Sequence, residues 1–303
     1  MKEIGGKVAI VTGASRGLGK YVAEALFDHG VKLLITARSA GELESVRAAF
    51  DRKGTRSLAI AGDITDEAFR ARLVAEAVEH FGSLDILVNN AGMDDPRRIT
   101  DVTLDGVRSM FDLNVVALID MTMKALPPML AQGSGHIVNM ASMAGLAPVP
   151  YASIYSASKH AIIGFSASIR YELEDQGIEV SAVCPNFVSE AGLFHDNTGG
   201  QTGEVPTVTP TQVADAVIKA IRGNKERVLV SPAFMKFTPV GVGVSPKLVA
   251  RLAKMTGSYA AMQGVADRHQ AEPQPEPVEP PPAATTNGTA PAAPRRTRAK
   301  KES

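Results

Sequence analysis

Short apolar runs alternate with longer segments of helical periodicity through the first 232 residues. The apolar runs, expected to be strands, lie at 8–11, 32–37, 57–61, 84–88, 135–142, 178–184 and 227–230. Helical spacing of apolar positions is found at 17–30, 41–53, 66–81, 104–130, 153–176 and 210–222. Such alternation implies right-handed crossovers between parallel strands. The pattern therefore predicts an α/β fold, a doubly wound parallel sheet of about seven strands with helices on both faces.

The pattern changes after residue 232, so we expect one domain over 1–232, an amphipathic helical extension over 233–265 and a tail over 266–303. Within 245–262, apolar positions such as Leu248 and Leu252 lie on one side and Lys247, Arg251 and Lys254 on another. This helix is expected to pack on the domain or on a partner subunit, with peripheral contact to a membrane as the alternative. The tail is rich in Pro, Ala, Glu and Thr with a basic end, a composition typical of disorder.

Composition narrows the class of protein. The chain has 303 residues, with 32 basic residues balanced by 32 acidic ones, and this argues against a nucleic-acid binder. The single cysteine, Cys184, lies in an apolar run and cannot form an internal disulfide. No run reaches the ~18 apolar residues of a membrane span, and the first residues do not resemble a signal peptide. A cytoplasmic enzyme that acts on a small molecule fits best.

A glycine-rich turn follows the first predicted strand. Gly13, Gly17 and Gly19 lie between that strand and the first helical segment, which is the order required to bring backbone N–H groups and a helix N-terminus to a pyrophosphate. Arg38 stands just after the second strand, where a dinucleotide-binding fold reads the adenosine ribose, and Arg16 lies within the turn. Arginine there favours the 2′-phosphate of NADP(H), although NAD(H) remains possible and both arginines could be solvated surface charges.

Further polar residues fall at predicted strand ends, where ligands bind in such sheets. Asp63 follows the third strand and could accept a hydrogen bond from an adenine amino group or cap the helix expected at 66. Asn90 follows the fourth strand.

Tyr155 and Lys159 lie four residues apart on a predicted helix, so their side chains share one face. A cation beside a phenol favours the phenolate and brings its pKa towards the working range of a general acid or base. The alternative is a half-buried tyrosine and a solvated lysine. Ser142 ends the fifth strand, where its hydroxyl could bind the oxygen of a carbonyl that Tyr155 protonates. Asn114 lies within the helical segment 104–130 and, if buried, needs a structural or functional reason.

In order and spacing, these motifs resemble the short-chain dehydrogenase/reductase family over about residues 5–232, whose fold is Rossmann-like. The turn Thr12 to Gly19 resembles its cofactor turn, the segment Asn89 to Gly92 its sheet-stabilising motif, and Asn114, Ser142, Tyr155 and Lys159 its catalytic tetrad. The resemblance implies that Lys159 also holds the nicotinamide ribose and that Asn114 anchors a water in a proton relay. It also implies cofactor contacts from Gly13, Ser15, Arg16, Gly17, Leu18, Gly19, Arg38, Asp63, Ile64, Asn90, Ala91, Gly92, Tyr155, Lys159, Pro185 and Val188.

The chain departs from the family after the sixth strand. The family has Pro-Gly with a threonine four residues later, whereas this chain has Pro185, Asn186 and Glu190. Asn186 can adopt the positive φ of the missing glycine. Glu190 is expected to bring a negative charge towards the cofactor, with Ser189 as a possible substitute for the threonine.

These observations predict an NADP(H)-dependent oxidoreductase that interconverts a ketone or aldehyde and its alcohol, without a metal. The alternative is a nucleotide-sensing regulator or scaffold on the same fold. A homodimer or homotetramer is expected. An apolar pocket for a lipophilic substrate is expected from loop residues at the strand ends, namely Met93, Met143, Leu146, Phe187, Leu193 and Phe194.

Overall fold

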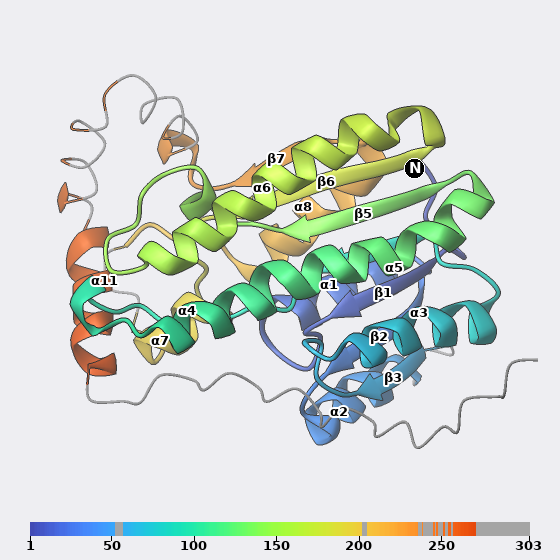
Figure 1. The fold of residues 1–303 in the computed structure, drawn as a ribbon, viewed down its shortest axis with the longest axis horizontal. Helices are drawn as coiled ribbons and strands as arrows, with labels where there is room; N and C mark the ends of the chain where they lie inside the picture. Colours follow the sequence, from blue (N-terminus) through green and yellow to red (C-terminus); the bar gives the residue numbers. More distant parts are fainter. Residues whose placement is uncertain are drawn as a thin grey trace, which may run out of the picture.

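The computed structural model describes residues 1–51, 57–201, 205–235 and 257–270, with isolated positions between 236 and 256. Its centre is a seven-stranded parallel sheet of order β3-β2-β1-β4-β5-β6-β7 (Figure 1). The strands are β1 Val8–Thr12, β2 Lys32–Ala37, β3 Ser57–Ala61, β4 Ile86–Asn89, β5 Gly135–Met140, β6 Ile178–Pro185 and β7 Arg227–Val230. The chain order reverses between β1 and β4, which pair in register from Ala9 opposite Ile86. The predicted doubly wound sheet is confirmed.

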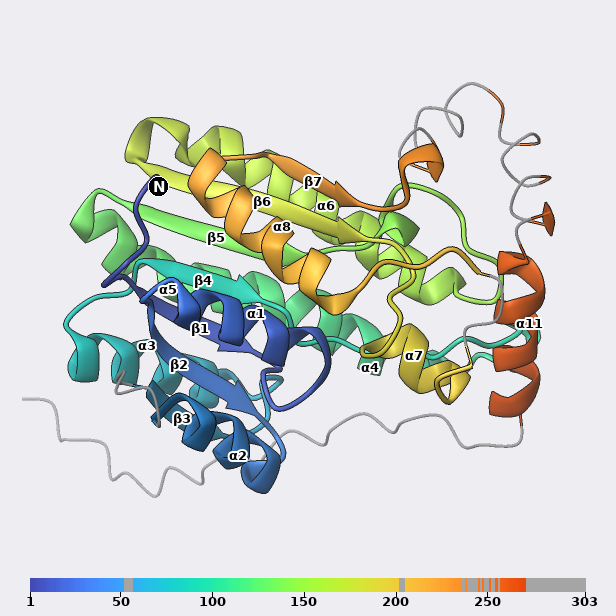
Figure 2. The same cartoon turned by 180° about the vertical axis from the view of Figure 1, so that it is seen from behind.

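Helices cover both faces of the sheet. On one face, α1 Gly17–Asp28, α2 Ala40–Asp51 and α8 Pro210–Gly223 pack against apolar strand residues (Figure 2). On the other, α3 Glu67–Phe81, α5 Ala117–Gln132 and α6 Ser153–Leu173 do the same (Figure 1). The strands are buried on both sides and therefore read in the sequence as continuous apolar runs rather than as alternating ones.

The long helical segment predicted at 104–130 is interrupted. It consists of α4 Leu104–Phe111, a π-helical turn at Asp112–Val116 and α5. The expected long helical segment is confirmed, since helix runs from Leu104 to Gln132. The π turn within it, which adds one residue to a helical turn, was not expected. The whole stretch Leu104–Gln132 is long and apolar enough to cross a membrane, but it packs along the sheet as a core helix of this fold.

The connections hold short helices. Segments of 3-10 helix lie at Ile99–Asp101, Met143–Gly145, Glu174–Gln176 and Ala233–Met235, and α7 spans Leu193–Thr198 inside the region 187–208 that showed no periodicity. The predicted N-cap role of Asp63 was wrong. Asp66 caps α3 by accepting from the N–H groups of Ala68 and Phe69.

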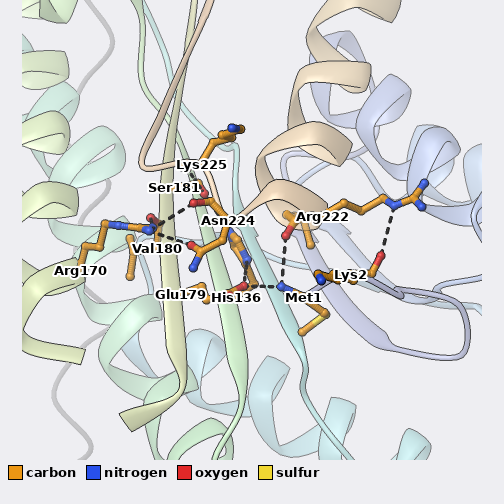
Figure 3. A network of polar contacts seen from close by, with 11 residues as sticks. Met1, Lys2, His136, Arg170, Glu179, Val180, Ser181, Arg222, Asn224 and Lys225 are labelled. Atoms are coloured by element: carbon orange, nitrogen blue, oxygen red, sulfur yellow. Dashed lines mark hydrogen bonds and ion pairs between the residues drawn. The ribbon is translucent and has the colours of Figure 1, made fainter. Parts of the chain in front are cut away.

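A polar network holds the amino terminus against the amino ends of β5 and β6, opposite to the carboxyl ends of the strands (Figure 3). The Met1 ammonium lies 2.6 Å from Glu179 Oε2, and His136 Nδ1 lies 2.8 Å from the same oxygen. Burial lowers the pKa of His136, so at neutral pH the ammonium is the positive partner of Glu179. The network fixes the start of the chain to β5 and β6.

The C-terminal helix α11, Ser258–His269, stands at the end of the molecule towards which the strand arrows point, with α4 and α7 (Figures 1 and 2). Met262, Val265 and Ala266 are buried there. The helix continues four residues past the boundary expected at 265. The predicted apolar residues Leu248 and Leu252 lie outside the described residues, as does the tail from 271.

Candidate active site

A large cavity of about 1660 Å³ opens at the carboxyl ends of the strands. Its wall includes the glycine turn, the loops after β2 to β6, the start of α6 and the inner face of α11. Ligands of open parallel sheets bind outside the carboxyl ends of the strands, near the point where the strand order reverses. The cavity is therefore the candidate site, and the predicted residues can be placed on it.

The glycine turn is built for close backbone approach. Gly13 and Gly17 have positive φ, +67° and +57°, and a Cβ on Gly19 would lie 2.1 Å from the Gly13 carbonyl oxygen. Asn90 holds the turn from β4, since its Nδ2 donates to the carbonyl oxygens of Thr12, at 2.9 Å, and Gly13, at 3.2 Å. A Cβ is therefore excluded at Gly19 and disfavoured at Gly13 and Gly17, and the two latter glycines line the cavity together with Ser15, Leu18, Ala91 and Gly92.

The end of the cavity near β2 carries the two predicted arginines. Arg38 is exposed and makes no ion pair within the described part of the chain. Arg16 Nη1 instead lies 2.8 Å from Asp196 of α7 and so links the glycine turn to the loop that follows β6. Asp63 accepts from Thr65 N–H and Oγ1, both at 2.8 Å, while Arg70 fixes the Ile64 carbonyl oxygen at 2.7 Å. Arg38, Arg16, Asp63 and Ile64 were predicted from the sequence, whereas their partners Asp196, Thr65 and Arg70 were not.

Asn114 lies in the π turn and is fully buried. Its Oδ1 accepts from Met93 N–H at 2.8 Å, and its Nδ2 donates to the Met93 carbonyl oxygen at 2.9 Å and to Ser158 Oγ at 3.1 Å. The extra residue of a π turn turns this amide towards β4 and α6. Asn114 thus fixes the loop after β4 against the helix that carries Tyr155.

Ser142, Tyr155 and Lys159 all line the cavity. Lys159 is buried, its Nζ donates to the Met140 carbonyl oxygen at 2.8 Å, and it lies 5.4 Å from the centroid of the Tyr155 ring. Ser142 Oγ accepts from Ala144 N–H at 3.1 Å. The first turn of α6 and the end of β5 therefore bring the three side chains together, as the sequence predicted.

The expected lowering of the Tyr155 pKa is not found. Burial raises the pKa of Tyr155, and the nearby charge of Asp94 raises it further, whereas a hydrogen bond with Ser142 opposes the rise. Burial also lowers the pKa of Lys159 to about 8, with Asp94 acting in the opposite direction. The prediction considered the lysine charge alone and omitted the cost of burying a phenolate.

The departure after β6 is accommodated differently from the expectation. Asn186 does not take a positive φ, and Glu190 does, at +67°. Glu190 is exposed and does not line the cavity, so the expected negative charge near the cofactor was wrong. Ser189 Oγ lies 3.3 Å from the Val208 carbonyl oxygen and also does not line the cavity. Pro185 and Val188 do line it, as predicted.

Five of the six predicted apolar residues line the cavity, and the rings of Phe187 and Phe194 pack with centroids 4.4 Å apart. Leu146 packs instead on a core cluster with Ile162 and Cys184, so its assignment was wrong. Sequence reasoning expected a helix in the C-terminal extension but did not place it at the cavity, which Tyr259, Met262 and Val265 of α11 line. It also missed the loop residue Asp94. Asp94 lies five residues after the end of β4. Loops after the carboxyl ends of strands bind ligands in such sheets, so the position of Asp94 could have identified it from the sequence.

Comparison with known proteins decides the family. Residues 7–199 match the family model described as short chain dehydrogenase. The chain is a short-chain dehydrogenase/reductase. Ketoacyl reductase HetN of Nostoc sp. is 35% identical over 262 residues, 85% of this chain and 91% of the relative. An uncharacterized oxidoreductase of Staphylococcus haemolyticus is 34% identical over 221 residues, 73% of this chain and 93% of the relative.

Two solved structures are similar to this short-chain dehydrogenase/reductase. One, from Burkholderia phymatum in complex with NAD, has a TM-score of 0.72 and 27% identity, covering 80% of this chain and 96% of its own. The other, a variant of actinorhodin polyketide ketoreductase with NADPH, has a TM-score of 0.67 and 29% identity, covering 74% and 95%. The protein is therefore an NAD(P)-dependent oxidoreductase acting on carbonyl or alcohol groups. Its turn, which has no side chain at Gly13, Gly17 and Gly19, fits a nicotinamide dinucleotide.

Proposed function

We propose that the protein is an NADP(H)-dependent reductase of ketones or aldehydes, with Tyr155 as the proton donor. The observation that carries the proposal is that Ser142, Tyr155 and Lys159 line the same cavity as the glycine turn and Arg38. A hydride source, a proton donor and a hydrogen-bond donor can then meet at one carbonyl group.

NADPH, when bound, supplies the hydride. The Tyr155 hydroxyl gives its proton to the carbonyl oxygen, and Ser142 orients that oxygen by a hydrogen bond. A phenol whose pKa is raised by burial keeps its proton at neutral pH. This supports a donor role and hence the direction of carbonyl reduction. Lys159, with a pKa of about 8, can both carry and release a proton near neutral pH, so it is suited to reprotonate Tyr155.

The preference for NADP(H) rests on Arg38. Its guanidinium is exposed at the end of β2 and has no acidic partner in the described ranges, so it is available to a 2′-phosphate. Arg16 would have to exchange Asp196 for the phosphate, at little cost because that ion pair is solvent-exposed.

The substrate is proposed to be lipophilic, of the keto-acyl kind or a similar apolar carbonyl compound. The cavity that contains Ser142 and Tyr155 is also lined by Met93, Phe187 and Phe194 and by the apolar residues Met262 and Val265 of α11. Two relatives named as a ketoacyl reductase and a polyketide ketoreductase support the same class.

A homodimer or homotetramer is proposed from an exposed apolar stripe. Val116, Met123 and Leu130 are spaced seven residues apart along α5 and its preceding turn and are 51%, 61% and 38% exposed. Apolar residues at this spacing form one side of a helix and favour packing on a second copy. Met123→Glu should shift the wild-type assembly to monomer in size-exclusion chromatography with light scattering, whereas Met123→Leu should not.

The test of the function is turnover. Purified protein is mixed with NADPH, or with NADH, and a panel of aliphatic and aromatic ketones, aldehydes and thioester-linked keto acids, and absorbance at the nicotinamide band is followed. We expect NADPH oxidation with an apolar ketone, abolished in Tyr155→Phe. NADPH binding without turnover of any compound would refute the proposal and favour a nucleotide-sensing protein.

A further inference from the structure

The cavity contains a carboxylate that the proposed reaction does not use. Asp94 lies two residues beyond Gly92 in the loop after β4 and lines the cavity. Its Oδ1 is buried and has no hydrogen-bond partner among the described residues. Burying a polar atom without a partner is costly, so such an atom in a native site needs an explanation.

The neighbouring charged groups leave this oxygen without a partner. Lys159 Nζ donates to the Met140 carbonyl oxygen, and Tyr155 is bound to Ser142. The adjacent carboxylate, Asp95, is paired with Arg97 at 2.8 Å and faces His269 Nδ1 at 3.3 Å. Of two consecutive acidic residues, one is therefore fixed within the protein and the other faces the cavity.

The loop that carries Asp94 is held rigidly by segments distant in sequence. Arg97 Nη1 donates to the His269 carbonyl oxygen at 2.6 Å, and Arg97 N–H donates to the Tyr151 carbonyl oxygen at 2.7 Å. On the outer side, Arg98 pairs with Asp267 at 2.6 Å. A side chain preorganised in this way recognises a ligand group without an ordering cost.

The surroundings select the kind of group that Asp94 can bind. Met93, Pro96, Met262 and Val265 share the cavity wall, so the partner belongs to a mainly apolar molecule. Burial and the charge of Asp95 raise the pKa of Asp94 to about 7, whereas Lys159 opposes the rise. A hydroxyl can donate to the ionised form and accept from the neutral one, so it suits a carboxyl group that titrates near neutrality.

We propose that Asp94 is a specificity-determining residue that binds a hydroxyl group of the substrate. The substrate is then an apolar carbonyl compound with one hydroxyl placed to reach Asp94 while its carbonyl group reaches Ser142 and Tyr155. This inference rests on the proposed reductase function and extends it to the substrate.

The experiment compares 2-decanone with 2-decanones that carry one hydroxyl at carbon 3, 4, 5 or 6, using the enzyme with NADPH. For at least one isomer, kcat/KM of the wild type should exceed that for 2-decanone about 10- to 100-fold, as expected for a hydrogen bond to a charged group. The preference should vanish or invert in Asp94→Leu. Asp94→Asn should retain part of it and lose its pH dependence between about pH 6 and 8.

Asp112→Asn, a change of an exposed carboxylate elsewhere on the cavity wall, is the control and should keep the wild-type preference. The Kd for NADPH should be unchanged in all variants. Wild-type enzyme that reduces 2-decanone as well as every hydroxylated isomer, or an unchanged preference in Asp94→Leu, overturns the inference. So does a loss confined to NADPH affinity, because the hydroxyl would then belong to the cofactor ribose.

A binding measurement distinguishes a failure of this inference from a failure of the proposed reductase function. Titration of the matching decanediols and 2-decanol into protein with NADPH, a pair of reduced compounds that cannot react with each other, measures the same preference without turnover. A diol preference that depends on Asp94 supports the inference even where no ketone is reduced, whereas equal binding refutes it.

Discussion

Removing α11 should open the substrate end of the cavity without disturbing the dinucleotide end. A chain ended at Gly257 loses the helix, and a chain ended at Gln270 keeps it and serves as the matched control. A cut at 268 would be less informative, because Arg268 donates to the Asn197 carbonyl oxygen and the His269 carbonyl oxygen accepts from Arg97.

The magnitude follows from what the helix buries. Met262 and Val265 are 3% and 0% exposed, and burial of each such side chain contributes about 1.5–3 kcal/mol, or about 3–6 kcal/mol together as an upper bound. The Arg98–Asp267 pair is about half exposed and adds at most about 1 kcal/mol. For a domain of this size, the corresponding fall in Tm is roughly 6–20 °C.

Substrate binding should weaken as well, since Tyr259, Met262 and Val265 form part of the cavity wall. We expect a rise in KM for an apolar ketone of at least about tenfold, from the loss of one or two apolar contacts, with an unchanged Kd for NADPH. Thermal melting, steady-state kinetics and calorimetric titration measure the three quantities. If the chains ended at Gly257 and Gln270 agree in Tm and KM, the helix neither stabilises the domain nor closes the cavity.

Three further predictions concern single residues. Tyr155→Phe should lower kcat by about 10²- to 10⁴-fold with little change in NADPH affinity, measured by single-turnover kinetics and fluorescence titration; near-normal rates would remove Tyr155 from the mechanism. Arg38→Asp should weaken NADPH binding about 10- to 100-fold and favour NADH, and a wild type that already prefers NADH would contradict the argument. Burial raises the pKa of Glu179, but hydrogen bonds from His136 and the Met1 amino group outweigh this effect and lower the pKa to about 2. Glu179 therefore stabilises the fold above pH 4.5, and this stability is lost as the pH falls towards 2. Glu179→Gln should lose about 1–3 kcal/mol at pH 7 and show a smaller acid-induced decline in denaturant titrations; parallel declines would exclude this network.

The sequence alone determined the fold and the core of the site. Strands buried on both faces must be continuous apolar runs, and crossover helices must show helical periodicity, so the order of elements could be predicted from local pattern. The glycine turn, Ser142 and the Tyr155–Lys159 pair were predictable for a related reason. The place of the glycine turn and of Ser142 is set by a strand end, and that of the Tyr155–Lys159 pair by the spacing of residues within one helix. Both relations involve only residues that are close in the sequence.

Only the tertiary structure decided the properties that depend on distant partners. The π turn at Asn114 is set by contacts with Met93 and Ser158, which lie on other elements. The pKa of Tyr155 rises because packing buries the phenol and places it near the charge of Asp94. The spacing of Tyr155 and Lys159 in the sequence does not reveal either effect. The wall formed by α11 depends on an Arg97–His269 contact across 172 residues. Local patterns specify how a segment folds, whereas burial and pairing across the chain specify which charges and surfaces face the cavity.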